Sequence, residues 1–203
     1  MTAARGSVEA AIATLRAGEL AVIPTDTVYG LAASGESKAA ARRLYAAKGR
    51  DAIQPTAVVL ASLELLHERV PGLPDDARRA ARALLPGPLT LVLPNPGRRY
   101  GWLNAKRPDA IGVRVPALRG PGREVLDALG SLVATSANLP GGPDPRRVDE
   151  VPAELVALAG AVVDGGELPG IPSTVIDVTG PEVRVLREGA VSLAAVLARL
   201  GAA

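Results

Sequence analysis

The stretch from Leu20 to Leu31 constrains this chain more than any other part of its sequence. Leu20 to Ile23 is a short apolar run, which predicts a buried strand, and Pro24 should end it because proline cannot donate to a β-ladder. Two threonines, an aspartate and a tyrosine follow, and Gly30 then permits a turn that other residues resist. Polar groups placed after a buried strand are typical of ligand sites in open α/β folds, although a Thr/Asp-rich turn can also bond only its own backbone.

Apolar spacing along the chain predicts helices that alternate with strands. Expected helices cover residues 7–17, 37–47, 62–70, 75–85, 121–129, 151–159 and 192–200, and expected strands cover 20–23, 56–61, 89–93, 111–115, 132–134, 161–163, 174–178 and 183–186. No linker is long enough to divide the chain, so residues 1–203 are expected to form one α/β domain. Because three closely spaced strands near the end favour antiparallel pairing, we expect a single-domain twisted mixed β-sheet with flanking helices.

The composition and the missing motifs exclude several kinds of site. The chain has no cysteine, which excludes disulfides, thiol chemistry and cysteine metal sites. The single histidine, His67, lies in a helical stretch, and it argues against a zinc site built from histidines or a Ser-His-Asp triad. The phosphate loop, the Gly-x-Gly-x-x-Gly fingerprint and the Gly-x-Ser-x-Gly elbow are all absent. A nucleotide would therefore have to be held by dispersed side chains.

The charge pattern favours small anions over membranes. The formal net charge is +2, and nearly all of the positive charge is arginine, since lysine occurs only at positions 38, 48 and 106. The guanidinium fork binds carboxylates and phosphates through two hydrogen bonds at once. No apolar run is long enough to span a membrane and no signal peptide is evident, so we expect a soluble cytoplasmic protein.

Several polar motifs lie near the ends of predicted elements. Taken alone, the pair in Lys48-x-Arg50 is explained by a helix C-terminus, and Ser136-x-Asn138 by an ordinary turn. Arg114 differs, because strand alternation buries it on one face, where it needs an anionic partner. That partner can be a ligand carboxylate or one of the chain's own acids.

In order along the chain, these motifs resemble the pattern of the YrdC-type threonylcarbamoyl-AMP synthase family, in its short single-domain form with a YrdC-like open sandwich. The signature Pro-Thr-Asp/Glu-Thr-x-Tyr-Gly stands at 24–30, and the rest of the pattern follows in sequence. The matching segments are Lys48 to Arg50, Pro86 to Thr90, Val113 to Pro116, Ser136 to Asn138, Ser173 to Asp177 and Leu186 to Gly189. Each motif is weak alone, but the ordered set covers essentially the whole chain.

The resemblance implies a nucleotidyltransferase that makes threonylcarbamoyl-AMP and pyrophosphate from L-threonine, bicarbonate and ATP, with Mg²⁺ accompanying ATP and no metal held by the protein itself. Partner proteins of this family then transfer the threonylcarbamoyl group to an adenosine in tRNA. By the same resemblance, Thr27, Arg114 and Ser173 should hold threonine, with Arg114 on its carboxylate. The expected catalytic residues are Lys48, Arg50, Ser136 and Asn138, and the expected ATP-binding residues are Arg50, Gln54, Ser136, Asn138, Asp144 and Arg187.

Some positions depart from the family pattern. Asp51 stands where proline is common, Val59 where histidine is common near the threonine site, and Asp144 where serine or threonine is common beside the phosphates. An acid near phosphates repels them unless a cation intervenes.

Two other functions remain open: a non-catalytic RNA-binding or ribosome-maturation module of the same fold, and a carbamoyl-transfer role like that of related domains in larger hydrogenase-maturation enzymes. Stacking aromatics for RNA are few, and the additional domains of those enzymes are not expected here.

Overall fold

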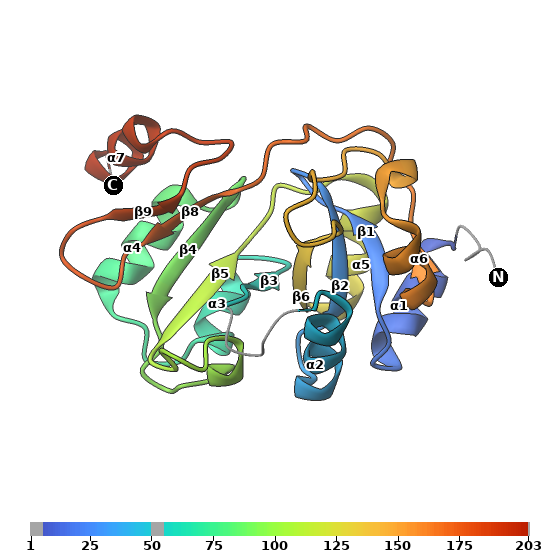
Figure 1. The fold of residues 1–203 in the computed structure, drawn as a ribbon. Coiled ribbons are helices and arrows are strands. Elements are labelled where there is room, and N and C mark those ends of the chain that lie inside the picture. The colour runs from blue at the N-terminus through green and yellow to red at the C-terminus, as the bar shows by residue number, and fades with distance from the viewer. Residues whose placement is uncertain (1–5, 50–54, 203) are drawn as a thin grey trace.

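The computed structural model describes residues 6–49 and 55–202, which fold as helices packed on a single sheet (Figure 1). The helices are α1 (Val8–Arg16), α2 (Lys38–Ala47), α3 (Glu64–Arg69), α4 (Asp75–Leu84), α5 (Gly120–Leu129), α6 (Ala153–Leu158) and α7 (Leu193–Gly201), with short 3-10 turns η1 (Gly101–Leu103) and η2 (Val148–Glu150). The strands are β1 (Ala21–Pro24), β2 (Tyr29–Ser34), β3 (Val58–Leu60), β4 (Leu89–Pro94), β5 (Ala110–Arg114), β6 (Ser131–Ser136), β7 (Ala161–Val162), β8 (Thr174–Asp177) and β9 (Arg184–Arg187). The predicted mixed α/β class is confirmed.

Serine caps explain where several helices begin. Ser7, Ser37 and Ser192 have extended backbones, and each side-chain oxygen accepts a hydrogen bond from the backbone N–H three residues later, at 3.1–3.3 Å. Such caps satisfy N–H groups that have no partner within the helix. No helix in the described part of the chain has both the length and the apolar content needed to cross a bilayer.

The sheet has the order β7-β1-β2-β6-β3-β5-β4-β8-β9 and mixes parallel with antiparallel neighbours. The three late strands were expected to show some antiparallel pairing, and β8 and β9 do pair in this way. β7 instead lies parallel to β1 at the opposite edge, and most antiparallel pairs involve earlier strands, such as β1 with β2 and β4 with β5. The chain between Val163 and Ser173 therefore crosses from one end of the sheet to the other (Figure 1).

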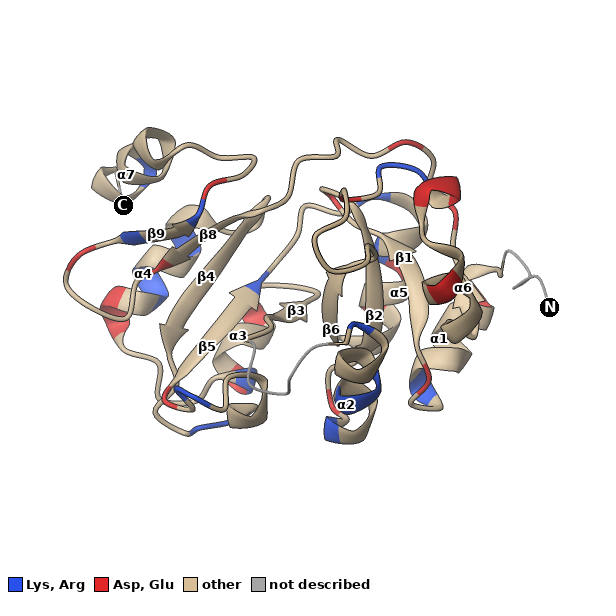
Figure 2. Cartoon of the chain, in the orientation of Figure 1, with Lys and Arg blue, Asp and Glu red and all other residues tan. Residues whose placement is uncertain are grey.

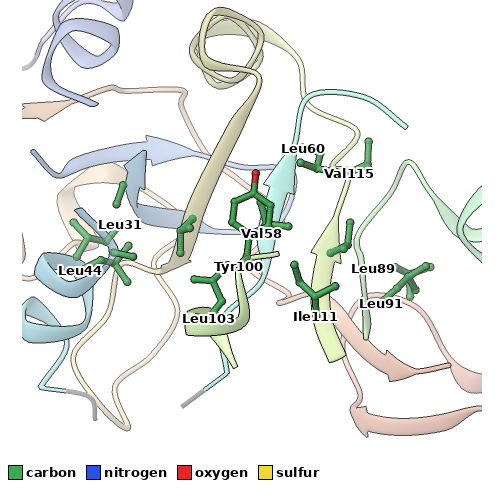
Figure 3. Packing of buried hydrophobic residues seen from close by; sticks show 14 of the residues in the cluster. Leu31, Leu44, Val58, Leu60, Leu89, Leu91, Tyr100, Leu103, Ile111 and Val115 are labelled. Atoms are coloured by element: carbon green, nitrogen blue, oxygen red, sulfur yellow. The ribbon is translucent and has the colours of Figure 1, made fainter. Parts of the chain in front are cut away.

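Alternating side chains divide each strand between the two faces of the sheet. In β1, Val22 joins a large apolar cluster that includes residues of α2, α3, α4 and α7, whereas Ala21 and Ile23 join a second cluster with α1 and α5. Figure 3 shows part of the first cluster, in which labelled aliphatic side chains from β2, β3, β4 and β5 lie on the same side of the sheet as Tyr100 and Leu103. The face that carries α1 and α5 is covered only in part, because both helices pack over one half of the sheet.

The backbone of α5 lies very close to the end of β1, at the edge of the part of the sheet that α1 and α5 cover. A Cβ atom on Gly122, in α5, would lie 2.3 Å from the carbonyl oxygen of Pro24 at the end of β1. Only glycine fits there without moving the helix away from the strand. The contact places the first turns of α5 beside the residues that follow β1.

Candidate active site

A cavity of about 260 Å³ opens on the uncovered part of the face that carries α1 and α5. Its floor lies over β3, β5, β4 and β8 and consists of small apolar positions: Ala57, Val59, Gly112, Val92 and Val175. Strand alternation explains this set, since the neighbouring residues of β4 and β5 point into the core on the opposite face. The cavity is therefore the unfilled half of one face of the sheet.

Residues from widely separated motifs meet at this cavity. Of the predicted site residues, the cavity is lined by Thr27, Arg114, Ser136, Asp144, Ser173 and Arg187. Lys48 and Asn138 belong instead to the layer behind the cavity wall. Arg50 and Gln54, together with the Asp51 departure, lie outside the described residues.

The signature turn after β1 is a closed hydrogen-bond network. The Thr25 hydroxyl donates to the Val28 carbonyl oxygen at 2.6 Å and accepts from the backbone N–H groups of Thr27 and Val28. The Thr25 and Thr27 hydroxyl oxygens lie 3.1 Å apart, and either could be the donor in that contact. The turn is therefore held by its own side chain and backbone groups, with the Thr27 hydroxyl next to that of Thr25.

Arg114 reaches this network from β5. Its Nη2 donates to the Thr27 hydroxyl oxygen at 2.7 Å and forms an ion pair with the Asp26 carboxylate, and the other Asp26 oxygen accepts from the Ala117 N–H at 3.1 Å. Charged residues are sparse on the strands of the sheet (Figure 2), so this pair stands out. One of the chain's own acids thus partners Arg114, as the second sequence interpretation allowed. The Arg114 Nε–H is buried and has no hydrogen-bond partner in the described structure.

Lys48 ends α2 and is buried, with 1% of its surface exposed. Its ammonium donates to the Ser136 carbonyl oxygen at 2.9 Å, to the Asn138 side-chain oxygen at 2.8 Å and to the Asn138 carbonyl oxygen. These bonds pin the turn after β6 to the end of α2. In this arrangement Lys48 supports the cavity wall, and its predicted catalytic role stays a prediction.

The opposite end of the cavity is built from hydroxyls and a guanidinium. Arg187 donates to the Ser173 carbonyl oxygen at 2.8 Å and to its hydroxyl oxygen at 3.1 Å, and the Ser173 and Thr90 hydroxyls lie 3.0 Å apart. Two hydroxyls that share one contact use one proton between them, so one proton is left for a ligand. This end of the cavity can donate to an anion.

The segment that crosses between the two ends of the sheet, residues 164–173, is tied to the signature turn. The Tyr29 hydroxyl donates to the Gly166 carbonyl oxygen at 2.8 Å and accepts from the Gly165 N–H at 2.9 Å. The Gly170 N–H donates to the Thr27 carbonyl oxygen at 2.8 Å. Burial is the largest cause that raises the pKa of Tyr29 above its usual value, which keeps the hydroxyl protonated as a donor.

Some participants were not predicted. Asp26 was read only as part of the signature, and its role as the partner of Arg114 depends on a contact between residues 88 positions apart. Thr90 was read as part of a motif without a role, although alternation with Leu89 and Leu91 would have placed it on the other face. Val59 does lie at the cavity, as its family position suggested.

Aromatic side chains are poorly placed for stacking on RNA bases. Tyr29, Tyr45 and Tyr100 are buried, and Trp102 is half-buried with its ring packed edge-on against Tyr100 at 6.1 Å between centroids. Bases stack on exposed rings in single-stranded nucleic-acid sites. The buried rings do not favour the RNA-binding alternative.

Comparisons with known proteins agree with the motif order. The Sua5/YciO/YrdC family model, described as telomere recombination, matches residues 13–189. The threonylcarbamoyl-AMP synthase of Pyrococcus abyssi is 36% identical over 184 residues, which cover 88% of this chain and 53% of that protein. The threonylcarbamoyl-AMP synthase of Stenotrophomonas maltophilia is 34% identical over 78% of this chain and 86% of that protein. The crystal structure of P. abyssi Sua5 complexed with L-threonine superposes with a TM-score of 0.84 at 33% identity, covering 96% of this chain and 57% of that one.

Proposed function

The chain belongs to the Sua5/YciO/YrdC family, and from that premise we propose that it is an L-threonylcarbamoyladenylate synthase. It would join L-threonine, bicarbonate and ATP to give threonylcarbamoyl-AMP and pyrophosphate. The observation that carries the proposal is the meeting of Thr27, Arg114, Ser136, Ser173 and Arg187, from separate motifs, at one cavity. The chain spans about half of the P. abyssi relative, so the activity of that whole protein is transferred here only as a proposal.

The proposed chemistry needs charge stabilisation rather than a protein nucleophile. Threonine's amino group adds to the carbon derived from bicarbonate, water leaves, and an oxygen of the resulting carbamate attacks the α-phosphorus of ATP as pyrophosphate departs. In the second step the negatively charged carbamate approaches the negatively charged phosphates of ATP. Fixed cations and N–H or O–H donors therefore lower the barrier of that step. Holding the carbamate in line with the leaving pyrophosphate supplies a further part of the rate.

The cavity offers the groups that such substrates require. The Arg114 guanidinium lines the cavity and suits the threonine carboxylate, and the Thr27 hydroxyl bonded to it suits a polar group of the amino acid. At the other end, Arg187 and the Ser173–Thr90 pair suit anionic oxygens. The apolar floor between these ends can cover the methyl group of threonine.

The proposal also includes the components that the sequence implied. Mg²⁺ would enter with ATP and neutralise charge on its phosphates. In the cytoplasm, partner proteins would take the threonylcarbamoyl group from the product to an adenosine of tRNA.

The test is a pyrophosphate-release assay on the purified protein with ATP, Mg²⁺ and bicarbonate. Addition of L-threonine should raise the release, serine should do so less well, and mass spectrometry should detect threonylcarbamoyl-AMP. Equal release with and without threonine would contradict the proposal. That result would leave the RNA-binding or carbamoyl-transfer alternatives, because neither consumes threonine.

A further inference from the structure

Asp144 is a carboxylate on the wall of a cavity proposed to bind a polyanion. It lies in the loop after β6, is half-buried, and lines the cavity beside Ser136. One of its oxygens accepts from the Asn138 side-chain N–H at 3.2 Å. In the described structure Asp144 forms no ion pair with an arginine or a lysine. Among the described residues, its negative charge therefore has no cationic partner.

The neighbouring Asn138 has no hydrogen-bonding capacity to spare. Its amide orientation is fixed, because the Lys48 ammonium can only donate and so must face the amide oxygen, at 2.8 Å. The amide nitrogen then donates to the Gly142 carbonyl oxygen at 2.7 Å and to Asp144. Asn138 thus orients the Asp144 carboxylate and cannot itself shield a phosphate from it.

Ser136 is likewise an acceptor at this place. Its hydroxyl donates its only proton to the Asn138 side-chain oxygen at 2.8 Å. The Ser136 oxygen keeps its two lone pairs, and Ser136 and Asp144 bond to the oxygen and the nitrogen of the same Asn138 amide. Two hard oxygen acceptors on one wall repel a phosphate but attract a divalent cation.

We propose that Ser136 and Asp144 hold the Mg²⁺ ion that accompanies ATP. The inference rests on the proposed function and adds a protein-held site to it, where the sequence predicted none. Mg²⁺ takes oxygen ligands and is commonly bound by one or two carboxylates together with substrate phosphates. A carboxylate and a neutral hydroxyl fit that requirement, with the remaining positions left to phosphate oxygens and water. The bound ion converts Asp144 from a repulsive group into one that attracts the nucleotide.

The experiment measures binding without turnover. Calorimetric titration of α,β-methylene ATP, whose α–β bridge resists cleavage, is run with excess Mg²⁺ and again with EDTA. We expect Mg²⁺ to tighten binding to the unaltered protein by at least about tenfold, since it cancels a repulsion between like charges. Asp144→Asn is isosteric and keeps an acceptor for Asn138. In this variant the ratio of the affinity with Mg²⁺ to the affinity with EDTA should fall below about threefold, and binding without metal should not weaken. Asp144→Ser should behave in the same way.

Asp149→Asn is the matched control, since Asp149 is a nearby exposed acid that pairs with Arg147 and does not line the cavity. It should keep the ratio of the unaltered protein. An unchanged ratio in Asp144→Asn would overturn the cation site while leaving the proposed function intact. Equal weakening with and without metal would also overturn it, because Asp144 would then bind the nucleotide itself. If the unaltered protein binds the analogue under neither condition, the proposed function fails.

Discussion

Replacing Arg114 with lysine separates its two possible roles, as an anchor for Asp26 and as a donor to the substrate. A lysine ammonium can still pair with Asp26 and bond to Thr27, since it keeps the charge and has three N–H donors. What it cannot reproduce is the planar guanidinium fork, which bonds to Asp26 and Thr27 through Nη2 and has further N–H groups in fixed positions. A hydrogen bond to a charged group contributes about 1.5 to 3 kcal/mol, so the dissociation constant for threonine should rise roughly 10- to 150-fold.

The assay is calorimetric titration of L-threonine into Arg114→Lys and the unaltered protein, together with thermal melts. The affinity for α,β-methylene ATP should change by less than about threefold, because the substituted group lies at the threonine end of the cavity. Arg184→Lys is the matched control, since Arg184 also pairs with an aspartate, Asp177 of β8, at 2.7 Å but does not line the cavity. It should leave threonine binding unchanged.

The opposite pattern would refute the reasoning. If Arg114→Lys lowers the melting temperature and leaves threonine affinity untouched, Arg114 serves only to hold Asp26 and the signature turn. The ion pair seen in the structure would then be the whole explanation for an arginine in β5.

The remaining predictions concern stability. Lys48→Met should lower the free energy of unfolding by roughly 1 to 3 kcal/mol for each oxygen left without its donor, and urea titration would show it; unchanged stability would contradict the supporting role. Burial alone would raise the pKa of Asp177, but hydrogen bonds from Thr179, Arg107 and Arg184 outweigh it and lower the pKa to about 2. That carboxylate therefore stabilises the fold above its unfolded pKa of about 3.8, and this contribution, on the order of 2 kcal/mol, is lost as the pH falls through about 2. Asp177→Asn should flatten the loss of stability between pH 4 and pH 2, and a profile as steep as that of the unaltered protein would contradict the assignment.

Periodicity predicted most elements because each face of a strand and each stripe of a helix must be buried separately. The helix expected at 37–47 is found as Lys38–Ala47, and the strand expected at 89–93 as Leu89–Pro94. β2, at Tyr29–Ser34, was not predicted, because nearly all of its residues are buried and it shows no alternation. The signature polar residues next to it looked like a loop. A strand buried on both faces leaves no period to detect.

The order of strands in the sheet had no such local signal. β7 and β8 are close in sequence, yet they lie near opposite edges, and the residues between them cross the whole fold. The same limit applies to the site. Ordered motifs indicated which residues would gather, but nothing near Asp26 in the sequence pointed to Arg114, and nothing near Lys48 pointed to Asn138.

The direction of each hydrogen bond is the property that the sequence predicts least, and it decides which substrate groups each hydroxyl can bind. Thr27 and Ser136 both carry hydroxyls, and sequence gives no reason to treat either as only a donor or only an acceptor. In the fold, Thr27 accepts from Arg114 and Ser136 gives its proton to Asn138, whereas the Ser173–Thr90 pair keeps one proton. An anionic oxygen placed against Ser173 and Thr90 can accept that proton, but one placed against Ser136 meets only lone pairs. The cavity thereby favours anionic oxygens at the end formed by Ser173 and Thr90.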